Sequence, residues 1–342
     1  MNSSPATRKR RISILGATGS IGRNTLDVMS HLGGREVFEV PAITGMGNIE
    51  LLAAQARQTG AKFAVTADPA RYDDLKSALA GSGIEAGAGP SALIEAGARD
   101  TDLLMAGIVG IAGLAPTLAA VANGADIALA NKECLVSAGD LFHEAITRGG
   151  GKLLPVDSEH NAIFQVLEQN QRHAVDRIIL TASGGPFRDY TREQMAAVTP
   201  EAAAVHPNWS MGLKISIDSA SMFNKALEQK LPICSKLPGP GFSRSLPVER
   251  LDFAKLAQLD FFAPDETRFP ALSLARTAMQ RGGLQGAVLN GAKEIALEAF
   301  IAGQIGFLEM ADIVADTMDR LDDGRVALTI DDIYETDRDA RA

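Results

Sequence analysis

Short apolar runs alternate with helically spaced stretches along the first 150 residues. The runs have the length and composition of buried strands: RISIL (11–15), VFEVPAIT (37–44), KFAVTA (62–67), DLLMAGIVG (102–110) and IALANKE (127–133). Between them, apolar residues recur every three or four positions, as in RNTLDVMSHL (23–32). Strands that alternate with helices form parallel sheets covered on both faces. The pattern therefore predicts an α/β domain with a doubly wound sheet at residues 10–150.

The pattern changes twice after residue 150. Further strands are expected in a central α/β domain at 151–245, from the segments KLLPVDS (152–158), RIILTASG (177–184) and KISIDSA (214–220). From residue 271 onward the apolar spacing is almost entirely helical. We therefore expect a C-terminal helical bundle at 271–342, joined to the central domain by a linker at 246–270.

Composition and charge exclude several classes of protein. The 342 residues are 46% hydrophobic and 22% charged, which is typical of globular domains. The net charge is −9 and no long basic run follows RKRR (8–11), so we expect no binding to nucleic acid. Only Cys134 and Cys234 are present, without metal-type spacing, and no apolar run is long enough to span a membrane. The sequence predicts a cytoplasmic protein without membrane contact.

Three glycines follow the first strand and open a helix. Gly16, Gly19 and Gly22 have the spacing of a Rossmann-type turn, where backbone N–H groups at a helix N-terminus approach a pyrophosphate. The alternative is a tight turn between strand and helix without a ligand. The second strand ends in 44–48 without the acidic residue that binds the NAD ribose, which disfavours NAD. It also lacks a basic residue for the NADP 2′-phosphate, so these residues alone favour NADP only weakly.

Two carboxylates follow the strand that ends near residue 156. Asp157 and Glu159 alternate along an extended strand end, and two hard oxygen ligands on one face suit Mg²⁺ or Mn²⁺. The alternative is that Asp157 or Ser158 caps the following helix. Downstream, TASGGPFR (181–188) and ISIDSASMFNKALE (215–228) are rich in side chains that bind phosphate oxygens. Between them, HPNWSMG (206–212) carries the only Trp and reads either as a mobile lid or as a surface loop.

Taken in order, these motifs resemble one enzyme family over nearly the whole chain. The resemblance to 1-deoxy-D-xylulose-5-phosphate reductoisomerases rests on GATGSIG (16–22), ANKECLVSAG (130–139), PVDSEHNAIFQ (155–165), TASGGPFRD (181–189), HPNWSMG (206–212), KISIDSASMFNKALE (214–228) and LDFFAPDETRFPAL (259–272). It implies an enzyme that isomerises and reduces 1-deoxy-D-xylulose 5-phosphate to 2-C-methyl-D-erythritol 4-phosphate in non-mevalonate isoprenoid biosynthesis. It further implies NADPH, a divalent ion (Mg²⁺ or Mn²⁺, with Co²⁺ as a further candidate) and a homodimer.

The resemblance also implies roles for individual residues. The metal would be held by Asp157, Glu159 and Glu228, and the catalytic group would comprise these three with Lys132 and His206. The substrate would contact Ser158, Ser183, His206, Trp209, Ser219, Asn224 and Lys225. The cofactor would contact Gly16, Thr18, Gly19, Ser20, Ile21, Gly22, Asn48, Asn131, Glu133 and Gly212.

The chain departs from the family pattern after Glu228, where several tens of residues that complete the central sheet and supply dimer contacts are missing. Two hypotheses follow: an active reductoisomerase, or a catalytically impaired relative or deletion product that retains only NADPH binding. A third, another dehydrogenase with the GATG turn, would need a catalytic Cys, and Cys134 has no obvious His partner. A smaller departure is Gly291 with Lys293, in a stretch that usually reads NAANE.

Overall fold

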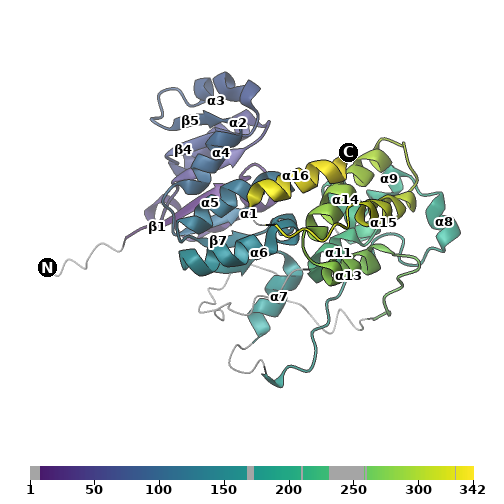
Figure 1. The fold of residues 1–342 in the computed structure, drawn as a ribbon. Helices are drawn as coiled ribbons and strands as arrows, with labels where there is room; N and C mark the ends of the chain where they lie inside the picture. Colours follow the sequence, from purple (N-terminus) through teal and green to yellow (C-terminus); the bar gives the residue numbers. More distant parts are fainter. Residues whose placement is uncertain (1–7, 168–172, 209–210, 231–257, 259, 328) are drawn as a thin grey trace.

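A single parallel sheet organises the first half of the chain in the computed structural model, which describes residues 8–167, 173–208, 211–230, 258, 260–327 and 329–342 (Figure 1). The strand order is β5-β4-β3-β1-β6-β7-β8, with β2 beside β1, and every pair is parallel. The predicted doubly wound α/β class is confirmed. The strands are β1 (Arg10–Leu15), β2 (Phe38–Glu39), β3 (Ala42–Gly45), β4 (Phe63–Thr66), β5 (Glu85–Ala88), β6 (Leu103–Ala106), β7 (Asp126–Leu129) and β8 (Leu153–Pro155).

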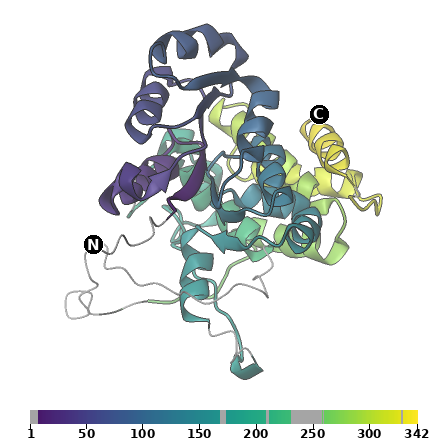
Figure 2. The same ribbon diagram turned by 90° about the vertical axis from the view of Figure 1, so that its left-hand side faces the viewer.

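Helices cover both faces of this sheet because successive strand side chains point to opposite sides. Ile14 of β1 belongs to a core with α2 and α3, whereas the next residue, Leu15, belongs to a core with α4, α5 and α6. Figure 2 shows early and later helices on opposite sides of the sheet. The connecting elements are α1 (Ser20–His31), η1 (Gly34–Glu36), α2 (Ile49–Thr59), η2 (Pro69–Arg71), α3 (Tyr72–Ala78), α4 (Gly89–Ala98), η3 (Ile111–Gly113), α5 (Leu114–Ala122) and α6 (Lys132–Gly149).

The strand order reverses between β1 and β6, and ligands of open α/β sheets bind outside the carboxyl ends of the strands at such a point. Gly16, directly after β1, has a φ of +84°, which favours glycine. A Cβ atom there would lie 2.6 Å from the carbonyl oxygen of Gly107, which follows β6. The glycine turn is therefore fitted between the two central strands.

The central stretch differs from the sequence expectation at all three predicted strands. The segment 152–158 does supply a strand, β8, but this strand adds to the first sheet beside β7. The strand predicted at 177–184 is wrong: this segment has no strand structure, and Ile179 is 73% exposed. An apolar extended segment becomes a strand only when another strand pairs with its backbone, and within the described part of the chain none does.

The strand predicted at 214–220 is also wrong, because this segment forms helix α10 (Leu213–Ala220). Apolar and polar residues alternate in this segment, which is the pattern of a strand. In the structure, however, the neighbouring residues 216, 217 and 218 are all buried, together with Ala220. Burial at adjacent and i+3 positions is a helical pattern. The other helices of the central stretch are α7 (Ser158–Val166), α8 (Arg192–Ala196), α9 (Pro200–Ala203) and α11 (Phe223–Lys230).

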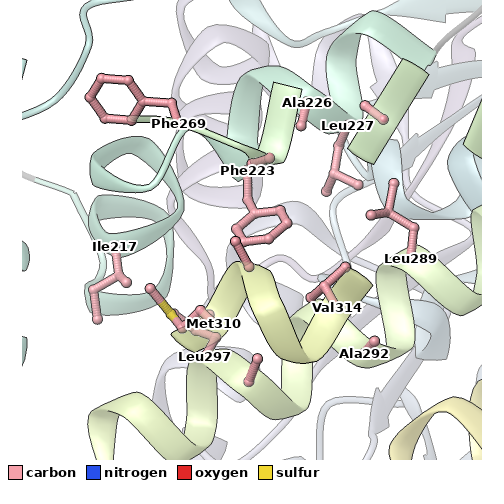
Figure 3. Close-up of a cluster of buried hydrophobic side chains, with 14 of the residues drawn as sticks. Ile217, Phe223, Ala226, Leu227, Phe269, Leu289, Ala292, Leu297, Met310 and Val314 are labelled. Atoms are coloured by element: carbon pink, nitrogen blue, oxygen red, sulfur yellow. The ribbon is translucent and has the colours of Figure 1, made fainter. Parts of the chain in front are cut away.

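The last part of the chain is helical in the described residues, as predicted, and packs on both earlier parts. Phe223 of α11 lies in a core with side chains of α14 and α15 (Figure 3). Ile333 of α16 belongs to the same buried cluster as Leu104 and Phe142 of the first domain, so α16 returns to the sheet (Figure 1). The helices are α13 (Ala271–Arg281), α14 (Gln285–Ile301), α15 (Glu309–Arg320) and α16 (Ile330–Arg341).

Much of the predicted linker, 246–257, lies outside the described residues. The domain boundaries at 150, 245 and 270 stay predictions. Across the described ranges, no helix is both long and apolar enough to cross a membrane.

Candidate metal and substrate site

Helix α11 supports one buried carboxylate of the candidate site. Its apolar residues, Phe223, Ala226 and Leu227, face the core shared with α14 and α15 (Figure 3). With 3.6 residues per turn, residues 224, 225 and 228 then share the other side. Glu228 is only 2% exposed. The apolar packing of α11 therefore fixes the position of a carboxylate that is nearly removed from solvent.

The other two carboxylates lie where β8 meets α7. Asp157 is the N-cap of α7: its Oδ1 accepts a hydrogen bond from the His160 backbone N–H (3.0 Å) and lies 2.7 Å from His160 Nδ1. Glu159 is in the first turn of the same helix, where the helix dipole favours a negative charge. The capping alternative weighed from the sequence is thus realised at Asp157. Capping and metal binding are compatible because both capping contacts use Oδ1.

The three predicted metal ligands are close together in space. Asp157, Glu159 and Glu228 each offer one carboxylate oxygen, and these oxygens all lie within 4.8 Å of one another. Two belong to one helix start and the third comes from α11, about 70 residues later. Mg²⁺ and Mn²⁺ prefer hard oxygen ligands of this kind. The donor set fits the predicted metal.

Two ammonium groups offset the negative charge of this cluster. Lys225 donates to Glu159 Oε1 (2.7 Å) and to Glu228, and its side chain is 5% exposed. Lys132, at the start of α6, donates to Glu228 Oε1 (2.9 Å) and to Asn224. Asn224 in turn donates to Glu228 Oε1 at 2.9 Å. A buried carboxylate is tolerated only when paired and hydrogen-bonded in this way.

The carboxylates at the α7 start are held in their charged form. Burial alone raises the pKa of Asp157, but hydrogen bonds and charge from His160 outweigh it, and the pKa lies below its usual range. Burial likewise raises the pKa of Glu159, and hydrogen bonds from Lys225 and Ser158 lower it further than burial raises it. Both groups are therefore ionised at neutral pH, as a metal ligand must be.

A second group of predicted residues lies around the end of α10. Ser183 Oγ is 2.9 Å from His206 Nε2 and accepts a hydrogen bond from the Gly185 N–H (3.1 Å). A Cβ atom at Gly185 would lie 3.0 Å from the carbonyl oxygen of Ser219, so this glycine loop packs directly on α10. Met222, with a φ of +64°, then turns the chain into α11. Ser183, His206 and Ser219 thus meet near the helix that carries Asn224 and Lys225.

Ser158 and Trp209 complete the set of predicted substrate contacts. Ser158 is exposed and its Oγ donates to Glu159 Oε2 at 2.7 Å. Trp209 lies outside the described residues, so its role in the predicted lid stays a prediction.

All the predicted nucleotide contacts except Gly212 lie at the carboxyl ends of strands β1, β3 and β7. The turn of residues 16–22 connects β1 to α1, and Asn48 caps α2 after β3 by accepting from the Leu51 N–H (3.1 Å). Asn131 caps α6 after β7, and its amide also donates to the Gly110 carbonyl (2.8 Å). Glu133 follows in the first turn of α6, and Gly212 is the N-cap residue of α10. Within this turn lie Gly16, Thr18, Gly19, Ser20, Ile21 and Gly22.

Sequence reasoning missed two side-chain contacts at or beside the predicted site. His160 contacts Asp157 from the third position of α7, and the spacing of a capping residue and a histidine three positions later could have indicated it. Lys293 forms a buried ion pair with Asp218 at 3.0 Å. Since 75 residues separate these two in the chain, no local pattern could have indicated their contact.

Known proteins match this chain over nearly its whole length. Family sequence models described as 1-deoxy-D-xylulose 5-phosphate reductoisomerase, its C-terminal domain, and the DXP reductoisomerase C-terminal domain match residues 12–139, 153–230 and 228–342. The reductoisomerase of Sinorhizobium fredii is 61% identical over 376 aligned positions, which cover 97% of this chain and 96% of the relative. This chain belongs to the 1-deoxy-D-xylulose-5-phosphate reductoisomerase family.

Other reductoisomerases agree with this assignment. The protein of Rhizobium etli is 59% identical, with 98% of this chain and 96% of the relative covered. The solved structure of the reductoisomerase from Zymomonas mobilis, in complex with NADPH, is 44% identical with a TM-score of 0.88, covering 98% of this chain and 97% of that chain. A reductoisomerase in complex with NADPH, fosmidomycin and magnesium is 34% identical with a TM-score of 0.87, covering 97% and 96%.

The chain is nevertheless shorter than its reductoisomerase relatives. Because 97% of 342 residues is about 332 residues, an alignment of 376 positions leaves about 44 positions of the Sinorhizobium relative without a counterpart here. The position predicted for this shortening, directly after Glu228, stays a prediction, and the residues that follow, 231–257, lie outside the described residues.

Proposed function

We propose that this reductoisomerase converts 1-deoxy-D-xylulose 5-phosphate to 2-C-methyl-D-erythritol 4-phosphate, using NADPH and Mg²⁺ or Mn²⁺, in non-mevalonate isoprenoid biosynthesis. The observation that carries the proposal is the meeting of Asp157, Glu159 and Glu228 within 4.8 Å, in a chain that belongs to this family. Structural relatives hold NADPH and magnesium. Co²⁺ is a further candidate for the metal because the same oxygen ligands accept it.

The proposed site has three groups of residues, which contact the metal, the substrate phosphate and the sugar end of the substrate. The carboxylates of Asp157, Glu159 and Glu228 would hold the metal, which when bound acts as a Lewis acid on the substrate oxygens. Ser183, His206, Ser219, Asn224 and Lys225 would hold the substrate phosphate, since hydroxyl, amide and ammonium groups donate to phosphate oxygens. Lys132 and Ser158 lie beside the carboxylates and would orient the sugar end.

The nucleotide would bind where the sheet changes direction. The turn of residues 16–22 presents backbone N–H groups at the N-terminus of α1. Asn48, Asn131 and Glu133 lie at the starts of α2 and α6, at the same edge of the sheet. Gly212 is the N-cap residue of α10. The substrate would be held at its sugar end beside the metal-binding carboxylates and at its phosphate by the phosphate-binding residues. Held at both ends, it would be oriented for isomerisation and hydride transfer without leaving the site.

The alternative, an impaired relative that retains only NADPH binding, requires that the shortening disrupts the metal site. Glu228 is the ligand nearest to the shortening in the chain. Its 2% exposure and its hydrogen bonds to Lys132, Lys225 and Asn224 favour an intact site instead.

The test is a turnover assay that follows NADPH absorbance after addition of 1-deoxy-D-xylulose 5-phosphate, with Mg²⁺ or Mn²⁺ and with EDTA. We expect metal-dependent turnover that Asp157→Asn lowers by at least about 100-fold, the upper range for changes beside a metal ligand. Asp176→Asn, the same change at an 85% exposed side chain, is the matched control and should leave turnover unchanged. NADPH binding without turnover in the unaltered protein would favour the impaired relative.

We also propose a homodimer in the cytoplasm. Large exposed apolar side chains support an interface: Ile179, Phe261 and Phe262 are 73%, 76% and 67% exposed. The free thiol of Cys134 suits a reducing compartment. Light scattering should give twice the chain mass of 36.0 kDa, and a mass of one chain would count against the dimer.

A further inference from the structure

A lysine is buried between helices at the edge of the proposed substrate site. Lys293 of α14 is 3% exposed, and its ammonium lies 3.0 Å from Oδ2 of Asp218 on α10. Asp218 is itself 8% exposed and directly precedes Ser219, a proposed phosphate ligand. Neither Lys293 nor Asp218 is among the residues to which the proposed function gives a role.

The surroundings of Lys293 keep it charged. Burial in itself lowers the pKa of its ammonium, but the negative charges of Asp218, Glu133 and Glu294 outweigh burial and raise that pKa. Glu133 is a proposed nucleotide contact at the start of α6, and Glu294 adjoins Lys293 on α14. The ammonium therefore lies in the field of acidic groups from three helices.

Stability does not explain this arrangement. Replacing a buried ion pair by apolar side chains of similar volume is often neutral or stabilising. The arrangement also has a free-energy cost, because two polar atoms are buried without hydrogen-bond partners in the described part of the chain. These atoms are Oδ1 of Asp218 and Oγ of Ser216, two residues earlier. What such a pair does supply is a fixed geometry between the elements that carry it.

The geometry that it fixes is that of the phosphate-binding loop. Asp218, Ser219 and Ala220 form the end of α10, and the loop of Gly185 packs directly on this end. A Cβ atom at Gly185 would lie only 2.7 Å from Ala220 Cα, so the contact leaves no room for a side chain. A shift of Asp218 would therefore move Ser219 and, through Gly185, the loop that carries Ser183. α14 is the rigid element behind this end, since 12 of its 17 residues are buried.

We propose that Lys293 is a positioning residue, which through Asp218 holds Ser219 and the Ser183 loop in place to receive the substrate phosphate. The proposal rests on the proposed function. Lys293 touches no substrate atom in this scheme, and its loss would weaken phosphate binding more than nucleotide binding.

The test compares Lys293→Met, Lys293→Arg and Lys214→Met. Lys214→Met is the matched control because Lys214 and Glu298 form an exposed ion pair (2.7 Å, each about half exposed) between the same two helices. We expect Lys293→Met to raise the KM for 1-deoxy-D-xylulose 5-phosphate about tenfold, as for groups that orient a ligand-binding residue, while the KM for NADPH changes less than about twofold. Inhibition by inorganic phosphate should weaken by a similar factor, Lys293→Arg should restore part of the loss, and Lys214→Met should change neither constant.

Two outcomes would overturn the role of Lys293: a lowered melting temperature with both KM values unchanged, or an equal rise in both. If Lys293→Met does not fold, Asp218→Asn removes the same link with less change of volume and carries the same expectation. Turnover of the unaltered protein is measured first, because its absence counts against the proposed function and not against Lys293. In that case calorimetric binding of the sugar phosphate to both proteins supplies the comparison.

Discussion

Lys225 contacts two of the three carboxylates that a divalent ion would use. Its ammonium contacts both Glu159 and Glu228, and with Lys132 it reduces the net charge of the cluster from −3 to −1. The residue therefore has two opposing effects on a metal. It keeps two carboxylates close together, and its positive charge repels a second cation.

We predict that Lys225→Met tightens binding of Mn²⁺ while lowering turnover. Removing one positive charge beside three carboxylates favours a divalent cation by electrostatics, and we expect a dissociation constant lower by roughly tenfold. Turnover falls because the substrate phosphate loses one of its proposed hydrogen-bond donors. Titration calorimetry with Mn²⁺ measures the first effect, and weaker Mn²⁺ binding would instead mean that Lys225 chiefly organises the carboxylates.

A second prediction at the residue scale concerns Gly22. A Cβ atom there would lie 2.4 Å from both the Ala17 Cα and the Gly16 carbonyl oxygen, so Gly22→Ala must displace backbone in the turn. We expect loss of NADPH binding and a lower melting temperature. Gly47→Ala, where a Cβ atom meets nothing within 4 Å, is the control for removal of a glycine near the same strand ends. Unchanged NADPH fluorescence titration in Gly22→Ala would contradict the prediction.

At the scale of elements, hydrogen bonds to Asp102 join β1 to β6 at the strand starts. Its carboxylate accepts from the Arg11 backbone N–H (2.9 Å) and from the Arg11 guanidinium (2.9 Å). The hydrogen bond from that guanidinium holds the pKa of Asp102 well below its usual range, although burial opposes this. These two strands are the pair between which the sheet changes direction, so Asp102 braces the edge opposite the proposed nucleotide site.

This lowered pKa predicts a pH-dependent stability difference. A carboxyl with a folded pKa below its unfolded value stabilises above about pH 4, and that stabilisation is lost as pH falls through the folded pKa. We expect Asp102→Asn to lower the free energy of unfolding by about 1–2 kcal/mol at pH 7 and by less at pH 3, allowing for its 26% exposure. Urea unfolding at both pH values measures this, with Asp100→Asn, 82% exposed, as the control. An equal loss at both pH values would refute the linkage.

The elements that the sequence predicted best are those whose partners are close in the chain. Strands β1, β4, β6 and β7 alternate with their own helices, so local periodicity was enough. It failed at 177–184 and 214–220, where strand or helix depends on distant partners. Short β5, made of Glu85, Gly87 and alanines, lacks the β-branched side chains that indicate a strand and was missed.

The candidate site was predicted in part for a different reason. Spacing alone indicated the pairing of Asp157 with Glu159 and the glycine turn, and composition indicated phosphate-binding side chains in 181–188 and 215–228. The metal role of Glu228 and the individual phosphate ligands followed only from the resemblance. His160 was not predicted although it lies only three residues from Asp157. Lys293 could not be predicted, because its contact with Asp218 across 75 residues depends on how α10 packs on α14. The periodicity of a sequence predicts which side of a helix is apolar, but not which other helix packs against that side.

At the scale of the whole molecule, α16 ties the end of the chain to its beginning. Ile333 is 1% exposed and packs into the cluster of Leu104 and Phe142, while Arg341 bonds to Asp337 (2.6 Å) and to Glu294 of α14 (2.5 Å). The last helix is thus bound to both the first sheet and the helical bundle. We infer that the two parts unfold as one cooperative unit.

We predict that Ile333→Ala lowers the free energy of unfolding by about 2–5 kcal/mol, the range for truncating a buried isoleucine. Val326→Ala, at a side chain that is 59% exposed, should change it by less than about 0.5 kcal/mol. Chemical unfolding followed by far-ultraviolet circular dichroism gives both values. A separate early transition in Ile333→Ala would show that α16 does not couple the two parts.

The return of α16 has a consequence for synthesis on the ribosome. Translation adds about 5–20 residues each second and domains fold as they emerge, so the first sheet is complete long before α16 has been made. Until then the side chains that Ile333 covers face water or a chaperone. A chain released before residue 330 lacks this cover, and apolar surface exposed in that way favours aggregation. Synthesis of α16 therefore sets the moment at which this part of the first domain is removed from water.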